Sequence, residues 1–215
     1  MNNILEQAQA IKNDIVEYRR TIHENPEVGD TLPKTKAYVM DKLRELGYEP
    51  KEICESGIVA TIEGPKPGKT FLLRADMDAL PMEETPNCDF ASKNGAMHSC
   101  GHDMHTAMLL GAAKLLRQNQ DQIEGTVKLV FQPDEEGFTG AKKMIKAGVL
   151  KNPDVDAAMA MHVHSGTPSN LILCGLGTSI GGCYRFRIAV KGTGCHGAMP
   201  ELGVDPINIA THIYL

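Results

Sequence analysis

The sequence predicts an α/β fold in which helices flank a mostly parallel sheet, followed by an incomplete α+β domain. One observation is the alternation of apolar, strand-like runs with helix-like segments over residues 1–161. Such alternation is typical of layered α/β domains with largely parallel strands. The other is a change of pattern after Gly181 and Gly182. We therefore expect one domain over residues 1–181 and the start of a second over residues 182–215.

Two helices are expected at the start of the chain, over residues 3–24 and 33–46. Apolar side chains recur there at helical spacing. Pro33 stands in a first turn, where proline is tolerated, and Gly47 follows the second segment as a stop signal.

The remaining elements of the first domain alternate in type, and turn residues such as Gly-Pro-Lys-Pro-Gly at 64–68 separate them. In chain order we expect strands at 57–63 and 70–76, a helix at 107–116, a strand at 125–131, a helix at 140–147 and a strand at 155–161.

The second domain is expected to begin with an alternating strand at 183–190 and to reach a helix at 205–215. This helix has no glycine stop, cap or polar tail before the sequence ends. We therefore expect the second domain to be truncated and its apolar faces to lack partners.

The composition excludes several classes of partner. The net charge is −5 and lysine and arginine form no block, so nucleic acid binding is not expected. No run approaches the roughly 18 apolar residues of a membrane span. The amino terminus lacks the features of a secretory signal, which favours a cytoplasmic protein. In that compartment we expect no disulfides among the six cysteines. They should be free thiols, apart from at least one thiolate bound to a metal.

The densest chemical signal is the run MHSCGHDMH at residues 97–105, just before a predicted helix. Cys100 and His102 combine a thiol with an imidazole, a pair that suits zinc or a similar ion. The glycine between them allows a tight bend that aims both side chains at one point. Alone, such a cluster is more often a structural site than a catalytic one.

A second signal is FQPDEEG at residues 131–137, at the carboxyl end of a predicted strand. In α/β sheets ligands bind at that edge. Adjacent carboxylates at a strand end project in different directions. One could therefore bind a metal while its neighbour serves as a general base. The alternative is a solvated acidic loop.

A third signal closes the next strand with His162 and His164. Both share one face of a strand, so spacing alone does not choose between them. A buried, hydrogen-bonded core histidine is the commoner outcome for either residue.

A fourth signal is a pair of carboxylates, Asp76 and Asp78, at the end of the predicted strand 70–76. They could support a metal-bound histidine by hydrogen bonding without binding the metal themselves. Alternatively, Arg74 pairs with these aspartates. Four such signals on one edge of a sheet are a stronger indication than any of them alone.

These motifs resemble a metallohydrolase family that contains aminoacylases, hippurate hydrolases, auxin-conjugate (indole-acetyl-amino-acid) hydrolases and N-acetyl-diaminopimelate deacetylases. The resemblance extends over essentially the whole chain, and its most specific part is MHSCGHDMH followed by FQPDEEG. The other matching runs are RRTIHENPEVG, LLRADMDALPMEE, VFQPDEEGFTGAKKMI and AVKGTGCHGAMPELGVDPI. It implies a zinc-peptidase-like catalytic domain, and a lid domain through which the complete protein forms a homodimer.

The resemblance also implies roles for individual residues. Two divalent cations are expected, zinc first because of the thiolate, with manganese, cobalt or nickel as alternatives. Their implied protein ligands are Cys100, which bridges the two ions, His102, Glu136 and His162. Family members carry one further metal-binding histidine near the carboxyl terminus, and this chain ends before it.

The implied reaction is hydrolysis of the amide bond of an N-acyl-amino acid by a hydroxide that bridges the metals. Glu135 is the implied base, and His196 is the implied stabiliser of the oxyanion. Two alternatives remain, a di-metal aminopeptidase or carboxypeptidase acting on small peptides and a non-catalytic, zinc-stabilised homologue. The sequence does not identify the acyl group or the amino acid.

Overall fold

The computed structural model describes residues 3–85, 88–178, 181–184 and 186–215. The chain divides into two compact units, Met1–Gly166 and Thr167–Leu215. The domain boundary predicted between residues 181 and 182 stays a prediction.

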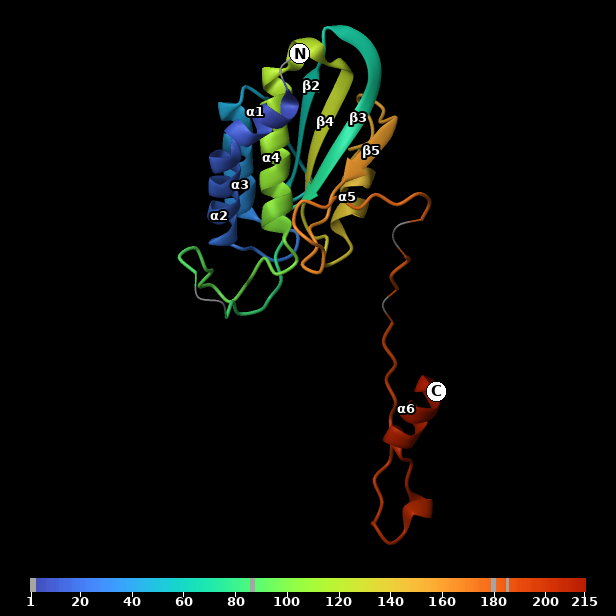
Figure 1. Ribbon diagram of the computed structural model, residues 1–215. Coiled ribbons are helices and arrows are strands. Elements are labelled where there is room, and N and C mark those ends of the chain that lie inside the picture. Colours follow the sequence, from blue (N-terminus) through green and yellow to red (C-terminus); the bar gives the residue numbers. More distant parts are fainter. Residues whose placement is uncertain (1–2, 86–87, 179–180, 185) are drawn as a thin grey trace. The chain divides into compact units, whose positions relative to one another are not determined.

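The first unit is built on a five-stranded sheet with the order β1-β2-β4-β3-β5 (Figure 1). Strand β3 lies between β4 and β5 and is parallel to both. Strand β2 is antiparallel to both of its neighbours, so the other four strands share one direction. The predicted mostly parallel sheet is confirmed. The strands are β1 (Lys51–Ile53), β2 (Gly57–Glu63), β3 (Lys66–Asp76), β4 (Glu124–Gln132) and β5 (Ala157–Ala160).

Helices cover both faces of this sheet, with α1 to α4 on one side and α5 on the other (Figure 1). None of the described helices is long and apolar enough to cross a bilayer. The helices of this unit are α1 (Ile4–Ala10), α2 (Lys12–His23), α3 (Pro33–Glu45), α4 (His102–Gln118), the short 3-10 helix η1 (Gln120–Gln122) and α5 (Gly140–Lys146).

Strand β4 shows how the sequence pattern builds the two layers. Its Leu129 and Phe131 pack into the large core under α2, α3 and α4. Val130, between them, points to the other face and packs with Met144 of α5. A strand covered by helices on both faces is apolar at successive positions, and β4 is buried from Lys128 to its end.

Some element boundaries differ from the sequence prediction. The single helix expected over residues 3–24 is interrupted at Ile11, which ends α1 and precedes α2. Strand β3 begins at Lys66, within the expected turn, and its register with β4 shifts before Thr70. At that irregularity a Cβ on Gly68 would lie 2.7 Å from the backbone nitrogen of Gly125. This close approach explains the glycine.

The second unit contains the 3-10 helix η2 (Pro200–Leu202) and helix α6 (Pro206–Tyr214). Asp205 caps α6, because its carboxylate accepts the backbone N–H groups of the helix's second and third residues. The predicted helix is confirmed. The strand predicted over 183–190 is not formed by its described residues, and none of the unit's described residues is buried. A strand needs a partner for its backbone hydrogen bonds.

Candidate metal centre

The carboxyl edge of the parallel strands gathers the chemical groups that the motifs contain. In the register of the sheet Asp76 pairs with Gln132 and Arg74 pairs with Ala160, so β3, β4 and β5 end side by side. The segments that follow them carry the acidic and histidine motifs. Helix α4 also begins at this edge, because its first residue, His102, is hydrogen bonded to Asp78.

Three overlapping groups of side chains at this edge could hold a metal ion. In each group the possible ligand atoms lie within 4.8 Å of one another. His102 belongs to all three, so the groups form one centre. The groups are Cys100 with His102 and His162, His102 with Glu135 and Glu136, and Asp76 with His102 and His105.

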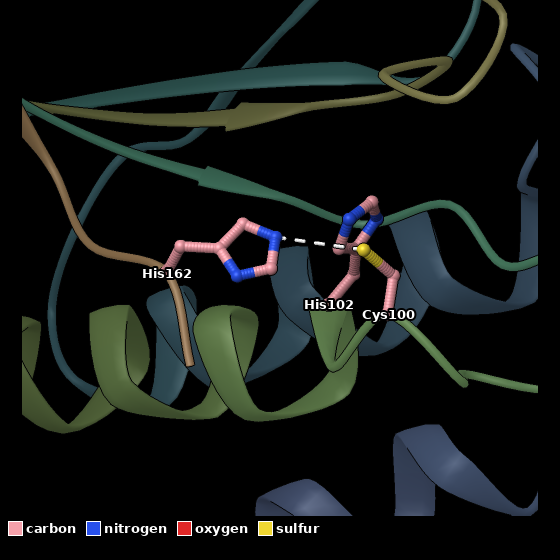
Figure 2. A group of neighbouring side chains, drawn as sticks. All are labelled: Cys100, His102 and His162. Carbon is pink, nitrogen blue, oxygen red and sulfur yellow. Dashed lines mark hydrogen bonds between the residues drawn. The ribbon is translucent and has the colours of Figure 1, made fainter. Parts of the chain in front are cut away.

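Cys100 and His162 face each other across this centre (Figure 2). The Sγ of Cys100 lies 3.5 Å from Nε2 of His162. A tetrahedral zinc with ordinary bond lengths separates a thiolate sulfur from an imidazole nitrogen by about 3.5 Å. The other ring nitrogen of His162 donates a hydrogen bond to the carbonyl of Val163 at 2.6 Å, which leaves Nε2 with its lone pair. His162, rather than His164, therefore joins the described cluster.

His102 is fully buried and presents one nitrogen to the centre. Its Nδ1 lies 2.8 Å from the carbonyl oxygen of Asp78 and must donate to it. Its Nε2 has no hydrogen-bond partner among the described residues, although a carboxylate oxygen of Asp76 lies 3.7 Å away. An unpartnered buried nitrogen is costly, and a bound cation would satisfy it. Burial lowers the pKa of His102, but Asp78 and Asp76 outweigh it and raise the pKa, so the surroundings favour positive charge.

Asp78 ties the end of β3 to the loop after β4. Its two carboxylate oxygens accept the backbone N–H groups of Glu135 at 3.0 Å and of Glu136 at 3.1 Å. The carboxylate therefore binds the main chain of the loop that carries these two glutamates.

Asp76 is shared between two cationic or polar partners. Arg74 donates to one of its oxygens at 2.6 Å, and Nδ1 of His105 contacts the other at 2.6 Å. The alternative in which Arg74 pairs with the aspartates thus holds for Asp76 and not for Asp78. Burial raises the pKa of Asp76, but His105 and Arg74 outweigh it and hold the pKa at about 2.

His105 is a residue of the centre to which the sequence analysis assigned no role. Its Nε2 accepts the backbone N–H of Val163 at 3.0 Å, so Nδ1 carries the proton that is donated to Asp76. The side chain therefore connects the segment after β5 to the end of β3. Its spacing of three residues from His102 on one helix was a usable signal, because such residues share a face.

The side chains of Glu135 and Glu136 are arranged differently from the sequence prediction. We expected adjacent carboxylates to diverge as on a pleated strand, but both reach within 4.8 Å of a nitrogen of His102. The reason is that β4 ends at Gln132 and both glutamates lie in a turn, where the pleat no longer applies. Burial, with Asp76 next in importance, raises the pKa of Glu135.

The surroundings of Cys100 disfavour its thiolate form in the absence of a cation. Burial, followed by the charge of Glu136, raises the pKa of this thiol to about 12. Cysteine binds metals as the thiolate, and a divalent cation would favour that form here. The predicted tight bend is present, since Gly101 has φ +91 and a Cβ there would lie 2.3 Å from a methyl of Val163. The donors present therefore fit a divalent metal centre.

His196 lies in the second unit, and its relation to the centre is not described. The side chain is exposed, and its Nδ1 accepts the backbone N–H of Ala198 at 3.1 Å. Its predicted role stays a prediction.

A largely parallel α/β sheet with sulfur, imidazole and carboxylate donors at its carboxyl edge defines an α/β domain with a candidate metal site. The chain belongs to Peptidase family M20/M25/M40, whose model matches residues 72–208. The family resemblance seen in the motifs is thereby confirmed.

Named relatives extend this assignment. The chain is 45% identical over 217 residues to thermostable carboxypeptidase 2 of Saccharolobus solfataricus, covering 95% of this chain and 55% of that protein. It is 39% identical over 206 residues to the N-acyl-L-amino acid amidohydrolase of Geobacillus stearothermophilus, covering 94% and 55%. A solved dinuclear metal-binding peptidase of the M20 family from Bacillus subtilis matches with a TM-score of 0.71 and 39% identity, over 74% of this chain and 45% of that one. The chain spans about half the length of these relatives.

Proposed function

We propose that this chain carries the metal centre of a hydrolase that cleaves the amide bond of N-acyl-amino acids. The observation that carries the proposal is the convergence of one thiol, two imidazoles and two carboxylates at His102, whose buried Nε2 has no hydrogen-bond partner within the described part of the chain. The similarity to a protein named as an N-acyl-L-amino acid amidohydrolase supports the choice of substrate class.

Four residues would hold two divalent cations, with zinc as the first candidate and manganese, cobalt or nickel as alternatives. They are Cys100, His102, Glu136 and His162. When bound, such cations polarise an amide carbonyl and lower the pKa of water to near neutrality. The loops that carry these ligands are held in place, because Asp78 accepts the backbone N–H of Glu136 and His105 accepts the backbone N–H of Val163.

Glu135 is the proposed general base. Its Oε2 lies 3.8 Å from the ligand nitrogen of His102, and burial raises its pKa, which makes the carboxylate a better proton acceptor. Glu135 takes one proton from the attacking water. It passes that proton to the amide nitrogen as the carbon–nitrogen bond breaks, which releases a carboxylic acid and a free amino acid.

Further parts of the proposal rest on the family resemblance. His196 is proposed to stabilise the oxyanion, and the second unit is proposed to belong to a lid through which two copies associate. The proposed location is the cytoplasm.

Replacement of the two glutamates in the complete protein tests the proposal. We expect Glu135→Ala to abolish hydrolysis of acetyl-, benzoyl- and indole-acetyl-amino acids while the metal content, measured by mass spectrometry, stays at the wild-type value. Glu136→Ala is the matched variant, and we expect it to lose bound metal. Turnover of Glu135→Ala at the wild-type rate would remove Glu135 from the reaction.

A second candidate is a carboxypeptidase that cleaves small peptides, because a relative with 45% identity carries that name. Rates on simple acetyl-amino acids and on small peptides with free amino termini distinguish the two activities. A protein that holds one tightly bound ion and shows no chelator-sensitive hydrolysis would instead be a structural zinc protein.

A further inference from the structure

The run RRTIHENPEVG, residues 19–29, holds none of the proposed ligands, although it is one of the motifs in which the sequence resembles the family. It begins within α2 and continues beyond the end of that helix. Its His23 is only 3% exposed, so it is a polar side chain held in the interior.

His23 is hydrogen bonded on both sides of its ring. Its Nδ1 lies 2.7 Å from a carboxylate oxygen of Asp103, and its Nε2 lies 2.9 Å from a carboxylate oxygen of Glu84. An ionised carboxylate only accepts hydrogen bonds, so both ring nitrogens donate. The ring thus connects two acidic groups that would otherwise repel each other.

These two carboxylates belong to the segments on either side of Cys100. Asp103 lies in the first turn of α4, next to His102, and Arg19 donates to the same oxygen at 2.7 Å. Glu84 lies in the long connection from β3 to α4. Hydrogen bonds through His23 therefore fix both the approach to Cys100 and the helix that follows it.

The Glu84 contact is itself anchored in the connection. Its second oxygen accepts the backbone N–H of Ser92 at 2.6 Å, and the hydroxyl of Ser92 donates to the carbonyl of Ala96 at 2.5 Å. Ala96 and Ser92 are buried. Residues 92–96 are thus tied to Glu84 just before the MHSCGHDMH run begins.

The same motif touches the other two loops of the centre through its backbone. The carbonyl of Glu27 accepts the N–H of Ala79 at 2.8 Å. The carbonyl of Gly29 accepts the N–H of Asp134 at 3.0 Å. Residues 23–29 therefore contact each of the three segments that follow β3, follow β4 and open α4.

We propose that His23 is a positioning residue of the metal centre: by joining Asp103 to Glu84 it sets the separation of Cys100 and His102 that a shared cation requires. The inference rests on the proposed metal centre and adds a residue that binds neither metal nor substrate. Loss of a hydrogen bond to a metal ligand typically weakens metal binding by about 10- to 100-fold, and because His23 contacts the neighbours of the ligands we expect the lower end, about 10-fold.

The test uses the complete protein loaded with Co²⁺, whose thiolate absorption reports on Cys100. We expect His23→Gln to weaken Co²⁺ binding about 10-fold in competition with a chromophoric chelator and to change the thiolate absorption band. Glu84→Gln removes one contact only and serves if His23→Gln does not fold.

The matched control is Tyr48→Phe. It removes a buried hydrogen bond of 2.8 Å to the carbonyl of Ala113 on the same helix α4, away from the metal loops. We expect this variant to lose stability and to keep both Co²⁺ affinity and spectrum. Wild-type Co²⁺ affinity and spectrum in the His23 and Glu84 variants would overturn this inference. An equal loss of Co²⁺ affinity in Tyr48→Phe would do the same. Neither result would bear on the proposed metal centre. A wild-type protein that binds no Co²⁺ would overturn the proposed metal centre as well.

Discussion

The carboxylate of Asp78 offers the sharpest test of how the centre is supported. In Asp78→Ala two backbone N–H groups, those of Glu135 and Glu136, lose a charged acceptor at 3.0 and 3.1 Å. A hydrogen bond to a charged group contributes about 1.5–3 kcal/mol, so two of them contribute about 3–6 kcal/mol. Water can reach these partly buried amides in the variant. We therefore expect the lower end, a loss of about 3 kcal/mol in the free energy of unfolding.

Urea unfolding followed by circular dichroism measures this loss, with a chelator present so that lost metal binding does not contribute. Asp78→Asn is the matched variant, because it keeps the shape and one acceptor oxygen but turns an N–H₂ group toward a backbone donor. We expect it to lose less stability than Asp78→Ala. A loss below about 1 kcal/mol for Asp78→Ala would refute the assigned hydrogen bonds.

Three further predictions concern single residues. Gly101→Ala should lose about 1–3 kcal/mol in urea unfolding and bind metal more weakly, since φ is +91 and the new Cβ meets Val163; unchanged metal titration would contradict this. Lys128→Met should lose about 3 kcal/mol, because the buried ammonium donates to three backbone carbonyls at 2.9–3.0 Å, and a variant as stable as wild type would disprove that contribution. Burial, opposed by Arg117, raises the pKa of Tyr48 from 10.0 to about 12. The folded state then keeps a proton that the unfolded state releases, so stability present below pH 10 falls by up to about 2–3 kcal/mol as the pH rises toward 12. Unfolding free energies of wild type and Tyr48→Phe across that range measure the difference, and parallel curves would count against it.

The location of the candidate centre could be predicted because the carboxyl ends of parallel strands lie at the same edge of a sheet. Asp78, Glu135 and His162 each follow an apolar strand, and a parallel sheet places such positions at one edge. Their distance along the chain was no obstacle, because alternating strands and helices already specified the sheet. The bend at Gly101 was predictable for a similar reason, since glycine is the residue that adopts positive φ without strain.

Other features depended on contacts for which the sequence has no periodic signal. The hydrogen bonds of His23 to Asp103 and Glu84 join residues 80 and 61 positions apart, and nothing local in RRTIHENPEVG indicates them. Strand β1 was missed because three residues carry too little alternation to detect. The strand predicted over 183–190 had the alternation but lacks, among the described residues, a neighbour for its backbone groups.

The loop after β4 is held through its own backbone N–H groups. The carboxylate of Asp78 and the carbonyl of Gly29 accept hydrogen bonds from them. The chemistry of this loop is carried separately, by the side chains at 135 and 136. Under the proposed function, substitution of either glutamate would change what the centre binds or transforms and would leave these backbone hydrogen bonds in place.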